Sequence, residues 1–140
     1  MILDTNVLAE SIRREPLAPV AGWISAQPAD QLFTTTISLA EMLLGVALLP
    51  VGRRRARLEE AIARIFQTVF TNRLLAFDEA AARVYAEFPA KRRRAGSPVS
   101  VSDAQIVAIA RSREARAIVT RNVRDFEGCG LKLINPWHTH

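Results

Sequence analysis

The stretch that decides the fold is Met1-Ile2-Leu3-Asp4-Thr5-Asn6-Val7. Its first residues are apolar and run directly into an aspartate, which is typical of a short buried strand that ends at a loop. A second apolar run, residues 117–120, is followed directly by Arg121. Ligands of open α/β sheets bind at the carboxyl ends of parallel strands. We therefore expect Asp4 and the segment from Arg121 onward to lie at the same edge of one sheet.

The rest of the chain alternates predicted strands with predicted helices. Strands are expected at 1–3, 31–35, 73–77, 117–120 and 131–134, and helices at 6–11, 20–26, 37–49, 53–70, 78–94 and 101–113. Asp78 is the expected N-cap of the helix that it precedes. This alternation predicts an α/β fold with a central, mostly parallel sheet flanked by helices. A chain of 140 residues is expected to form one domain, residues 1–140.

Composition and charge narrow the class of protein. Hydrophobic residues make up 49% of the chain, enough for a buried core, and the formal net charge is +5. A basic protein is predisposed to bind polyanions such as nucleic acid. The single cysteine excludes an intrachain disulfide and favours a reducing compartment. No apolar run is long enough to cross a membrane, so we expect a cytoplasmic protein without a membrane partner.

Three acidic residues, Asp4, Glu41 and Asp103, are candidates for one site. Each alone could simply cap or complement a helix: Asp4 before the first helix, Glu41 in the S-x-x-E pattern that begins at Ser38, and Asp103 after Ser102 as N-cap. Helical phase favours a different interpretation. Glu41 is in phase with apolar residues of its helix, and Asp103 is in phase with those of the last helix, so both are expected on buried faces.

Buried carboxylates need a partner, because an unpaired charge away from water is unfavourable. The arginines of this chain cluster elsewhere, at 53–57 and 92–94. Two carboxylates ~4 Å apart repel by about 4 kcal/mol at an effective dielectric constant near 20. A divalent cation removes this conflict, and oxygen ligands without a His or Cys cluster select Mg²⁺ or Mn²⁺. Such a cation is suited to hydrolysis of a phosphodiester.

Several motifs together resemble the PIN-domain nucleases, especially the VapC and FitB type toxins of bacterial toxin–antitoxin pairs. The motifs are the opening residues 1–7, the segment 37–45 around Glu41, the segment 102–106 around Asp103, Val119-Thr120-Arg121-Asn122 with Asp125-Phe126, and the ending Ile134-Asn135-Pro136-Trp137. Their order and spacing cover nearly the whole chain. The resemblance implies a metal-dependent endoribonuclease.

By this resemblance Asp4, Glu41 and Asp103 are metal-site acids. Asp4 and Asp103 are expected as direct ligands, and Glu41 as a ligand or a base that orients water. The family often has a fourth acid at the position that Asn122 occupies here. Asp125 is a candidate to supply the missing charge. The loss of this acid affects the binding of a second metal ion more than the binding of the first. The possible supporting or phosphate-binding residues are Thr5, Asn6, Thr120 and Arg121, in addition to Asp125.

The resemblance also implies partners: an RNA substrate, a cognate antitoxin of the VapB or FitA kind, and a second copy of the chain in a homodimer. DNA would be reached only indirectly, through the antitoxin. The residues proposed for an exposed apolar contact patch are Leu48, Leu49, Tyr85 and Phe88. Two other functions stay open: a PIN nuclease of RNA processing without a toxin role, and a non-enzymatic basic module that binds nucleic acid. A third is a phosphatase of the haloacid dehalogenase type, but these enzymes normally have a second aspartate two residues after the first, where this sequence has Asn6.

Overall fold

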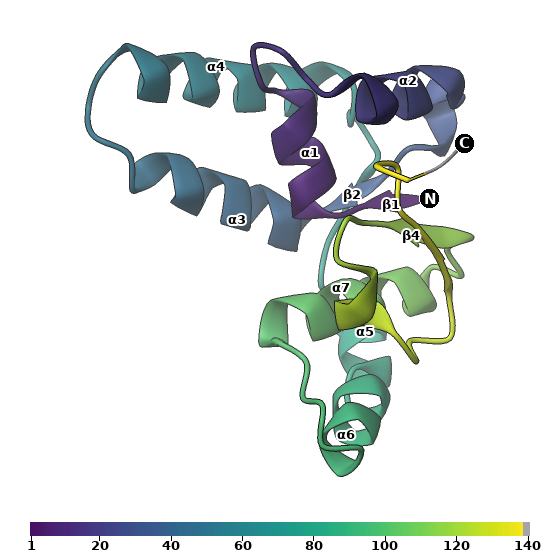
Figure 1. The fold of residues 1–140 in the computed structure, drawn as a ribbon. Coiled ribbons are helices and arrows are strands. Elements are labelled where there is room, and N and C mark those ends of the chain that lie inside the picture. The colour runs from purple at the N-terminus through teal and green to yellow at the C-terminus, as the bar shows by residue number, and fades with distance from the viewer. Residues whose placement is uncertain (139–140) are drawn as a thin grey trace.

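A parallel sheet lies between two groups of helices in the computed structural model, which describes residues 1–138. The strands are β1 (Ile2–Leu3), β2 (Thr34–Thr35), β3 (Leu74–Leu75), β4 (Ala117–Val119) and β5 (Lys132–Ile134). The helices are α1 (Thr5–Ser11), α2 (Ala18–Ala26), α3 (Thr36–Ala47), α4 (Arg53–Thr68), α5 (Glu79–Val84), α6 (Glu87–Arg94) and α7 (Val101–Ser112), with short 3₁₀ turns η1 (Ala29–Gln31) and η2 (Val123–Phe126). Figure 1 shows α1–α4 on one side of the strands and α5–α7 on the other.

The pairing of the strands fixes which residues meet at the sheet edge. β1, β4 and β5 pair in that order, β2 pairs with β3, and all these pairs are parallel. A parallel bridge between Ile2 and Phe33 joins the two groups of strands. Leu3 is opposite Val119 in the register of β1 and β4. Asp4 and Thr120, the next residue of each strand, therefore leave the sheet side by side.

The central strands contribute alternate side chains to two cores. Ile2 and Ile118 belong to the core formed with α5, α6 and α7, whereas Leu3 and Val119 belong to the core formed with α1–α4. Successive residues of a strand point to opposite faces, so a sheet covered on both sides needs apolar residues at every position. This explains why β1 and β4 read as continuous apolar runs, and the parallel sheet between two groups of helices confirms the predicted α/β class.

Three predicted elements differ clearly from the structure. The strand expected at 73–77 is reduced to the two residues of β3. The helix expected at 78–94 is divided into α5 and α6, because Pro89 in the first turn of α6 has no N–H to continue the hydrogen bonds of α5. Asp78 is nevertheless the N-cap of α5, as predicted, and accepts from the Ala81 amide at 3.0 Å. The strand expected at 31–35 is shorter than predicted, since η1 takes its first residue, Phe33 forms only an isolated bridge, and β2 begins at Thr34.

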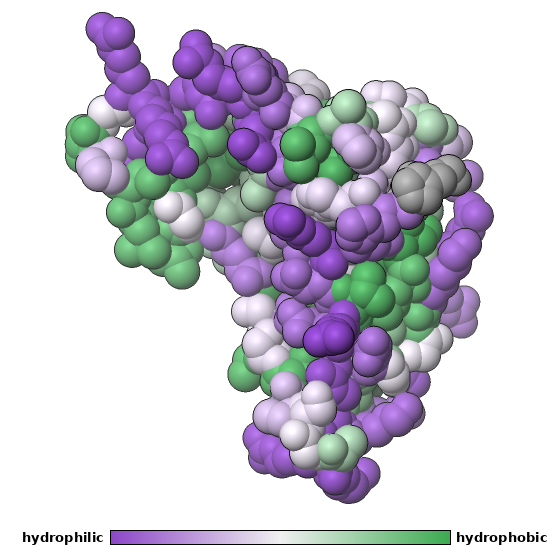
Figure 2. Space-filling model, viewed as in Figure 1, coloured by the Kyte–Doolittle hydropathy of each residue, from purple (hydrophilic) through white to green (hydrophobic). Residues whose placement is uncertain are grey.

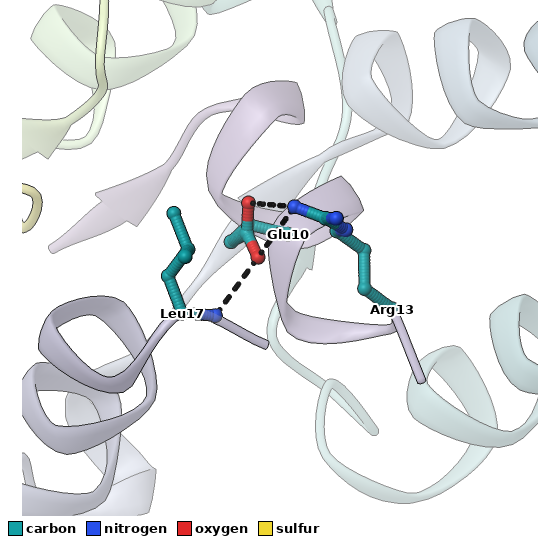
Figure 3. Close-up of polar contacts among 3 residues, drawn as sticks. All are labelled: Glu10, Arg13 and Leu17. Atoms are coloured by element: carbon teal, nitrogen blue, oxygen red, sulfur yellow. Dashed lines mark hydrogen bonds and ion pairs between the residues drawn. The ribbon is translucent and has the colours of Figure 1, made fainter. Parts of the chain in front are cut away.

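A buried carboxylate, Glu10, holds the connection between α1 and α2 (Figure 3). Glu10 is 7% exposed and accepts from the Leu17 amide at 3.0 Å. Its carboxylate also pairs with the Arg13 guanidinium at 3.2 Å. Leu17 is the N-cap residue of α2, and its apolar side chain makes no capping hydrogen bond to the helix. Glu10 thus fixes the direction in which the chain enters α2.

Replacement of Glu10 by alanine is expected to lower the free energy of unfolding by about 2 kcal/mol, because the Leu17 amide loses a charged hydrogen-bond acceptor. Urea denaturation of both proteins measures the change. Glu15→Ala is the matched control, since Glu15 is exposed, and it should stay within about 0.5 kcal/mol of the parent. Equal effects of the two substitutions would show that the Glu10 contacts do not stabilise the fold.

The surface carries exposed apolar residues where α3 ends. Leu44, Leu48 and Val51 are 60%, 76% and 91% exposed, and Figure 2 shows hydrophobic surface over this end of α3, at the left of the view. The predicted exposure of Leu48 is confirmed, but that of Phe88 is wrong: Phe88 is 2% exposed and packs in the core beneath α6. Among the described residues, no helix is long and apolar enough to cross a membrane.

Candidate active site at the carboxyl edge of the sheet

Asp4 lies directly after β1 and is bound to the residue that follows β4. Its backbone N–H donates to the Val119 carbonyl at 2.9 Å. Its Oδ1 accepts from the Thr5 amide and its Oδ2 from the Thr120 hydroxyl, both at 2.8 Å. The side chain is 5% exposed. Asp4 therefore caps α1 and also lies at the shared strand edge, as the apolar runs before it and before Arg121 predicted.

Glu41 reaches this edge from α3, but not from a buried face. The buried residues of α3 are Ser38, Met42 and Val46, while Glu41 is exposed. The argument from a buried stripe was therefore wrong for this residue, because Leu44 and Leu48, which are in phase with it, are themselves solvent-exposed. Glu41 is instead anchored by the Thr5 hydroxyl, which donates to its Oε1 at 2.8 Å. This bond joins α3 to the residue after Asp4.

Asp103 projects from the first turn of α7. The N-cap of this helix is Ser100, not Ser102, and its hydroxyl accepts from the Asp103 amide at 3.1 Å. Asp103 is half-buried, and the residues in phase with it, such as Ile106 and Val107, are buried as predicted. The helix start thus places a carboxylate at the border between the core and solvent.

The segment after β4 is folded back against α1. The Thr120 hydroxyl accepts from the Asn122 amide at 3.1 Å and lies 3.4 Å from Asn6 Nδ2, a weaker contact. Asn6 Oδ1 accepts from the Arg121 amide at 3.2 Å. Arg121 and Asn122 are both exposed. The buried Thr120 therefore organises a loop whose next side chains face solvent beside Asp4.

The carboxylates of this edge influence one another electrostatically. Burial raises the pKa of Asp4, despite hydrogen bonds from Thr120 and Thr5 that oppose the shift, and the charges of Glu41 and Asp125 raise it further. Burial likewise raises the pKa of Asp103 to about 6, followed by the charges of Asp4, Asp125 and Glu41. Asp125 thus acts on both Asp4 and Asp103, from the 3₁₀ turn η2.

Sequence reasoning did not include two residues that belong to this neighbourhood. Ser38 is fully buried, with its hydroxyl 3.0 Å from that of Thr5. Its place in an S-x-x-E pattern suggested only a helix cap, a role that Thr35 has in the structure. Trp137 was named only as part of the closing motif, yet the guanidinium of Arg121 lies over its ring. No sequence signal joins residues 121 and 137, because the contact depends on the turn after β5.

A comparison of the sequence with models of known protein families identifies the family of this chain. The sequence matches the model of the PIN domain family over residues 1–128. The chain belongs to the PIN domain family. The Asp4, Glu41 and Asp103 segments all lie within the matched region, as does the loop after β4.

Relatives of this PIN-domain protein include a plasmid stability protein, a ribonuclease and a toxin. It is 44% identical to the plasmid stability protein StbB of Pseudomonas syringae pv. tomato, with 98% of each chain covered. It is 34% identical to the VapC ribonuclease Y4jK of Sinorhizobium fredii, over 98% of this chain and 97% of the relative. It is 31% identical to toxin FitB of Neisseria gonorrhoeae, with 99% of both chains covered.

A solved structure agrees with this placement. The PIN-domain protein is similar to a chain in the structure of FitAB bound to the IR36 DNA fragment, with a TM-score of 0.90 and 32% identity. The match covers 99% of this chain and 96% of that chain. The similarity therefore extends over the whole fold, including both groups of helices.

The donor groups of the PIN-domain edge fit a hard divalent cation. Asp4, Glu41, Asp103 and Asp125 offer only oxygen ligands, which Mg²⁺ and Mn²⁺ prefer. Among residues 1–138, Asp4 and Asp103 form no ion pair with a basic side chain. No three acidic, His or Cys side chains in this described part are arranged as a ready metal shell. Without a cation, the charges of these acids repel one another.

The raised pKa of Asp103 predicts how stability depends on pH when no divalent cation is present. An acid that binds its proton more tightly in the folded state stabilises the fold when it is protonated. With a chelator present, the contribution of protonated Asp103 to folding stability is expected to be complete below pH 3.8, the usual pKa of an aspartate. It is expected to be lost as the pH rises through the folded-state pKa of about 6. Allowing for solvent screening of this half-buried group, the change is about 1–2 kcal/mol.

Thermal unfolding of the wild type and Asp103→Asn between pH 4 and pH 7, in chelator, measures this contribution as the difference between the two proteins. The variant should gain stability relative to the wild type as the pH rises, because it lacks the group that becomes charged. A difference that stays constant across this range would contradict the raised pKa.

Proposed function

We propose that residues 1–140 form a single Mg²⁺- or Mn²⁺-dependent endoribonuclease domain that acts as the toxin of a toxin–antitoxin pair. The observation that carries the proposal is the environment of Asp4. This buried carboxylate lies at the carboxyl edge of a parallel sheet, without a basic partner among the described residues and within the electrostatic influence of Glu41, Asp103 and Asp125. Such an arrangement suits cation binding and phosphodiester hydrolysis.

The side chains of this edge have separate roles in the proposal. Asp4 and Asp103 hold the cation directly, and Glu41 holds it or orients water. Thr120 and the Thr5 amide fix the two oxygens of Asp4 through their hydrogen bonds, while the Thr5 hydroxyl fixes Glu41. When bound, the cation supplies polarisation of a phosphoryl oxygen and lowers the pKa of a bound water.

The loop after β4 completes the proposed site. Asn122 has an amide where related nucleases often have a fourth acid, and its side chain brings no charge. Asp125 supplies a negative charge that acts on both Asp4 and Asp103. We therefore assign the fourth acidic role to Asp125, with Asn122, Asn6 and Thr120 as supporting residues and Arg121 as a phosphate-binding residue.

RNA as the substrate is supported by the name of the Sinorhizobium relative, a VapC ribonuclease. The direct test incubates the purified chain with labelled single-stranded RNA and with DNA of the same sequence, in Mg²⁺ and in Mn²⁺. Metal-dependent cleavage of RNA is expected. If RNA is bound but never cleaved, the chain is a basic nucleic-acid-binding module and the nuclease proposal fails.

The toxin role is supported by the similarity to FitB and to a FitAB complex. The proposed partners are an antitoxin of the VapB or FitA kind and a second copy of the chain. The exposed apolar residues Leu44, Leu48 and Val51 offer a surface for such contacts. DNA would be reached through the antitoxin alone, and the proposed location is the cytoplasm.

Induced expression in a bacterial host separates a toxin from a nuclease of RNA processing. The wild type is expected to stop growth, and co-expression of the cognate antitoxin is expected to restore it. Normal growth of cells that contain cleavage-competent protein would support the RNA-processing role instead.

A further inference from the structure

Arg121 and Trp137 form a stacked pair beside the candidate active site. The guanidinium carbon of Arg121 lies 5.2 Å from the centre of the Trp137 ring, within the range of a cation–π contact. Arg121 forms no ion pair within residues 1–138. Its charge and hydrogen-bond donors are therefore open to a ligand.

Backbone hydrogen bonds hold both partners of this pair to the site. The Arg121 amide donates to Asn6 Oδ1 at 3.2 Å, and its carbonyl lies 3.4 Å from Asn135 Nδ2, a weaker contact. Asn135 Oδ1 in turn accepts from the Trp137 amide at 2.9 Å. Asn135 therefore connects the segment after β5 to the segment after β4, and Asn6 connects the latter to α1.

The pair borders a groove that contains active-site residues. Arg121 and Trp137 line a groove of about 470 Å³ together with Thr5, Asn6 and Glu41. Two further arginines, Arg13 and Arg54, line the same groove, and Arg13 is paired with Glu10. Among the arginines of this groove, Arg121 directly follows Thr120 in the chain. The Thr120 hydroxyl donates to the Asp4 carboxylate, so Arg121 is attached to the residue that binds Asp4.

We propose that Arg121 binds an RNA phosphate that flanks the scissile bond, and that Trp137 is a positioning residue that holds its guanidinium over the groove. This inference rests on the proposed ribonuclease function. Arginine donates hydrogen bonds in a planar fork that matches phosphate oxygens, and it stacks well on aromatic rings. The indole Nε1 has no hydrogen-bond partner in the described part of the chain. The ring therefore contributes through its face and its packing.

The test measures binding of a fluorescent single-stranded RNA by anisotropy, in the inactive Asp4→Asn background. Arg121→Ala is expected to weaken binding roughly tenfold, the usual effect of losing a charged hydrogen bond. The slope of log affinity against log salt should also fall by about 0.7, the value for one phosphate contact of a single strand. Arg116→Ala is the matched control: Arg116 lies at the opposite end of the sheet, against Gln31, and its removal should change binding much less.

A double-mutant cycle isolates the role of Trp137. Trp137→Leu is expected to weaken binding about threefold when Arg121 is present, and to have no further effect in the Arg121→Ala protein. Trp137→Phe, which keeps an aromatic face, should recover most of the loss. Thermal unfolding of each variant verifies that the fold persists, and Trp137→Phe serves where the leucine variant does not fold.

Additive effects of Trp137 and Arg121 substitutions would overturn the positioning role, because a merely structural tryptophan acts regardless of Arg121. An equal loss in Arg116→Ala would overturn the phosphate role of Arg121, and so would the absence of RNA binding in the parent. Cleavage by the otherwise wild-type chain is assayed separately. If the wild type cleaves RNA but the Arg121 and Trp137 substitutions have additive effects on binding, this inference alone fails. If the wild type binds RNA without cleaving it, the proposed nuclease function fails.

Discussion

Asp4→Asn is expected to reduce the rate of RNA cleavage at least about 100-fold, because the site loses a group that holds the catalytic cation. The substitution keeps the size of the side chain and removes its charge. Asparagine can still accept a hydrogen bond from the Thr120 hydroxyl or from the Thr5 amide, the donors of the two short bonds to Asp4. Activity should therefore fall without loss of the fold.

The stability of this variant provides an internal check. Burial raises the pKa of Asp4, so the folded protein disfavours the charged form, and a neutral amide removes that penalty. The melting temperature in chelator should equal or exceed that of the wild type. Asp30→Asn is the control for activity, because Asp30 is exposed at the opposite end of the sheet. Full activity of Asp4→Asn would remove Asp4 from the mechanism.

Removal of divalent cations is expected to have an effect at least as large. Cleavage in EDTA should fall at least about 100-fold, because the acids of the edge repel one another when no cation neutralises them. Mg²⁺ or Mn²⁺ should restore cleavage. Zn²⁺ should restore less, since its usual His and Cys ligands are absent from the candidate site.

The measurement is an initial rate at several concentrations of each metal after exhaustive chelation. Its control is protein that has been chelated and then returned to Mg²⁺, which shows that chelation itself did no damage. Cleavage that persists in EDTA at the original rate would exclude the proposed metal-dependent chemistry.

The end of β1 could be predicted from the sequence because a local signal and a general rule agree there. Apolar residues that run into Asp4 indicate a buried strand, and parallel strands place their carboxyl ends together. The register of Leu3 with Val119 confirms that Asp4 and Thr120 meet. The place of Asp103 was predictable because it comes just before the apolar stretch 106–110 of its helix, which is buried in the structure.

The position of Glu41 could not be predicted from periodicity, because both faces of α3 contain apolar residues. Leu44 and Leu48 are exposed, and Met42 and Val46 form the buried face. Periodicity alone does not show which of two apolar stripes is covered by the rest of the protein. The Arg121–Trp137 contact was unpredictable for another reason, since it depends on the pairing of β4 with β5 and on Asn135.

The basic run at 91–94 illustrates a third limit of sequence reasoning. A basic run of this kind is compatible with a solvated face and with a groove for phosphates. Arg92 instead donates to the carbonyls of Ser97 and Asp125, at 2.7 and 2.9 Å, and lies over the Phe88 ring. At least one residue of the run therefore holds the loop that carries Asp125, a role that composition cannot distinguish from ligand binding.

Direct titration of Mn²⁺ into the metal-free protein, followed by electron paramagnetic resonance, tests whether the acids at the carboxyl edge hold a cation. The wild type is predicted to bind Mn²⁺, and Asp4→Asn and Asp103→Asn to bind it at least about tenfold more weakly, while Asp30→Asn matches the wild type. Equal Mn²⁺ affinity in all four proteins, or no binding by the wild type, would contradict the account.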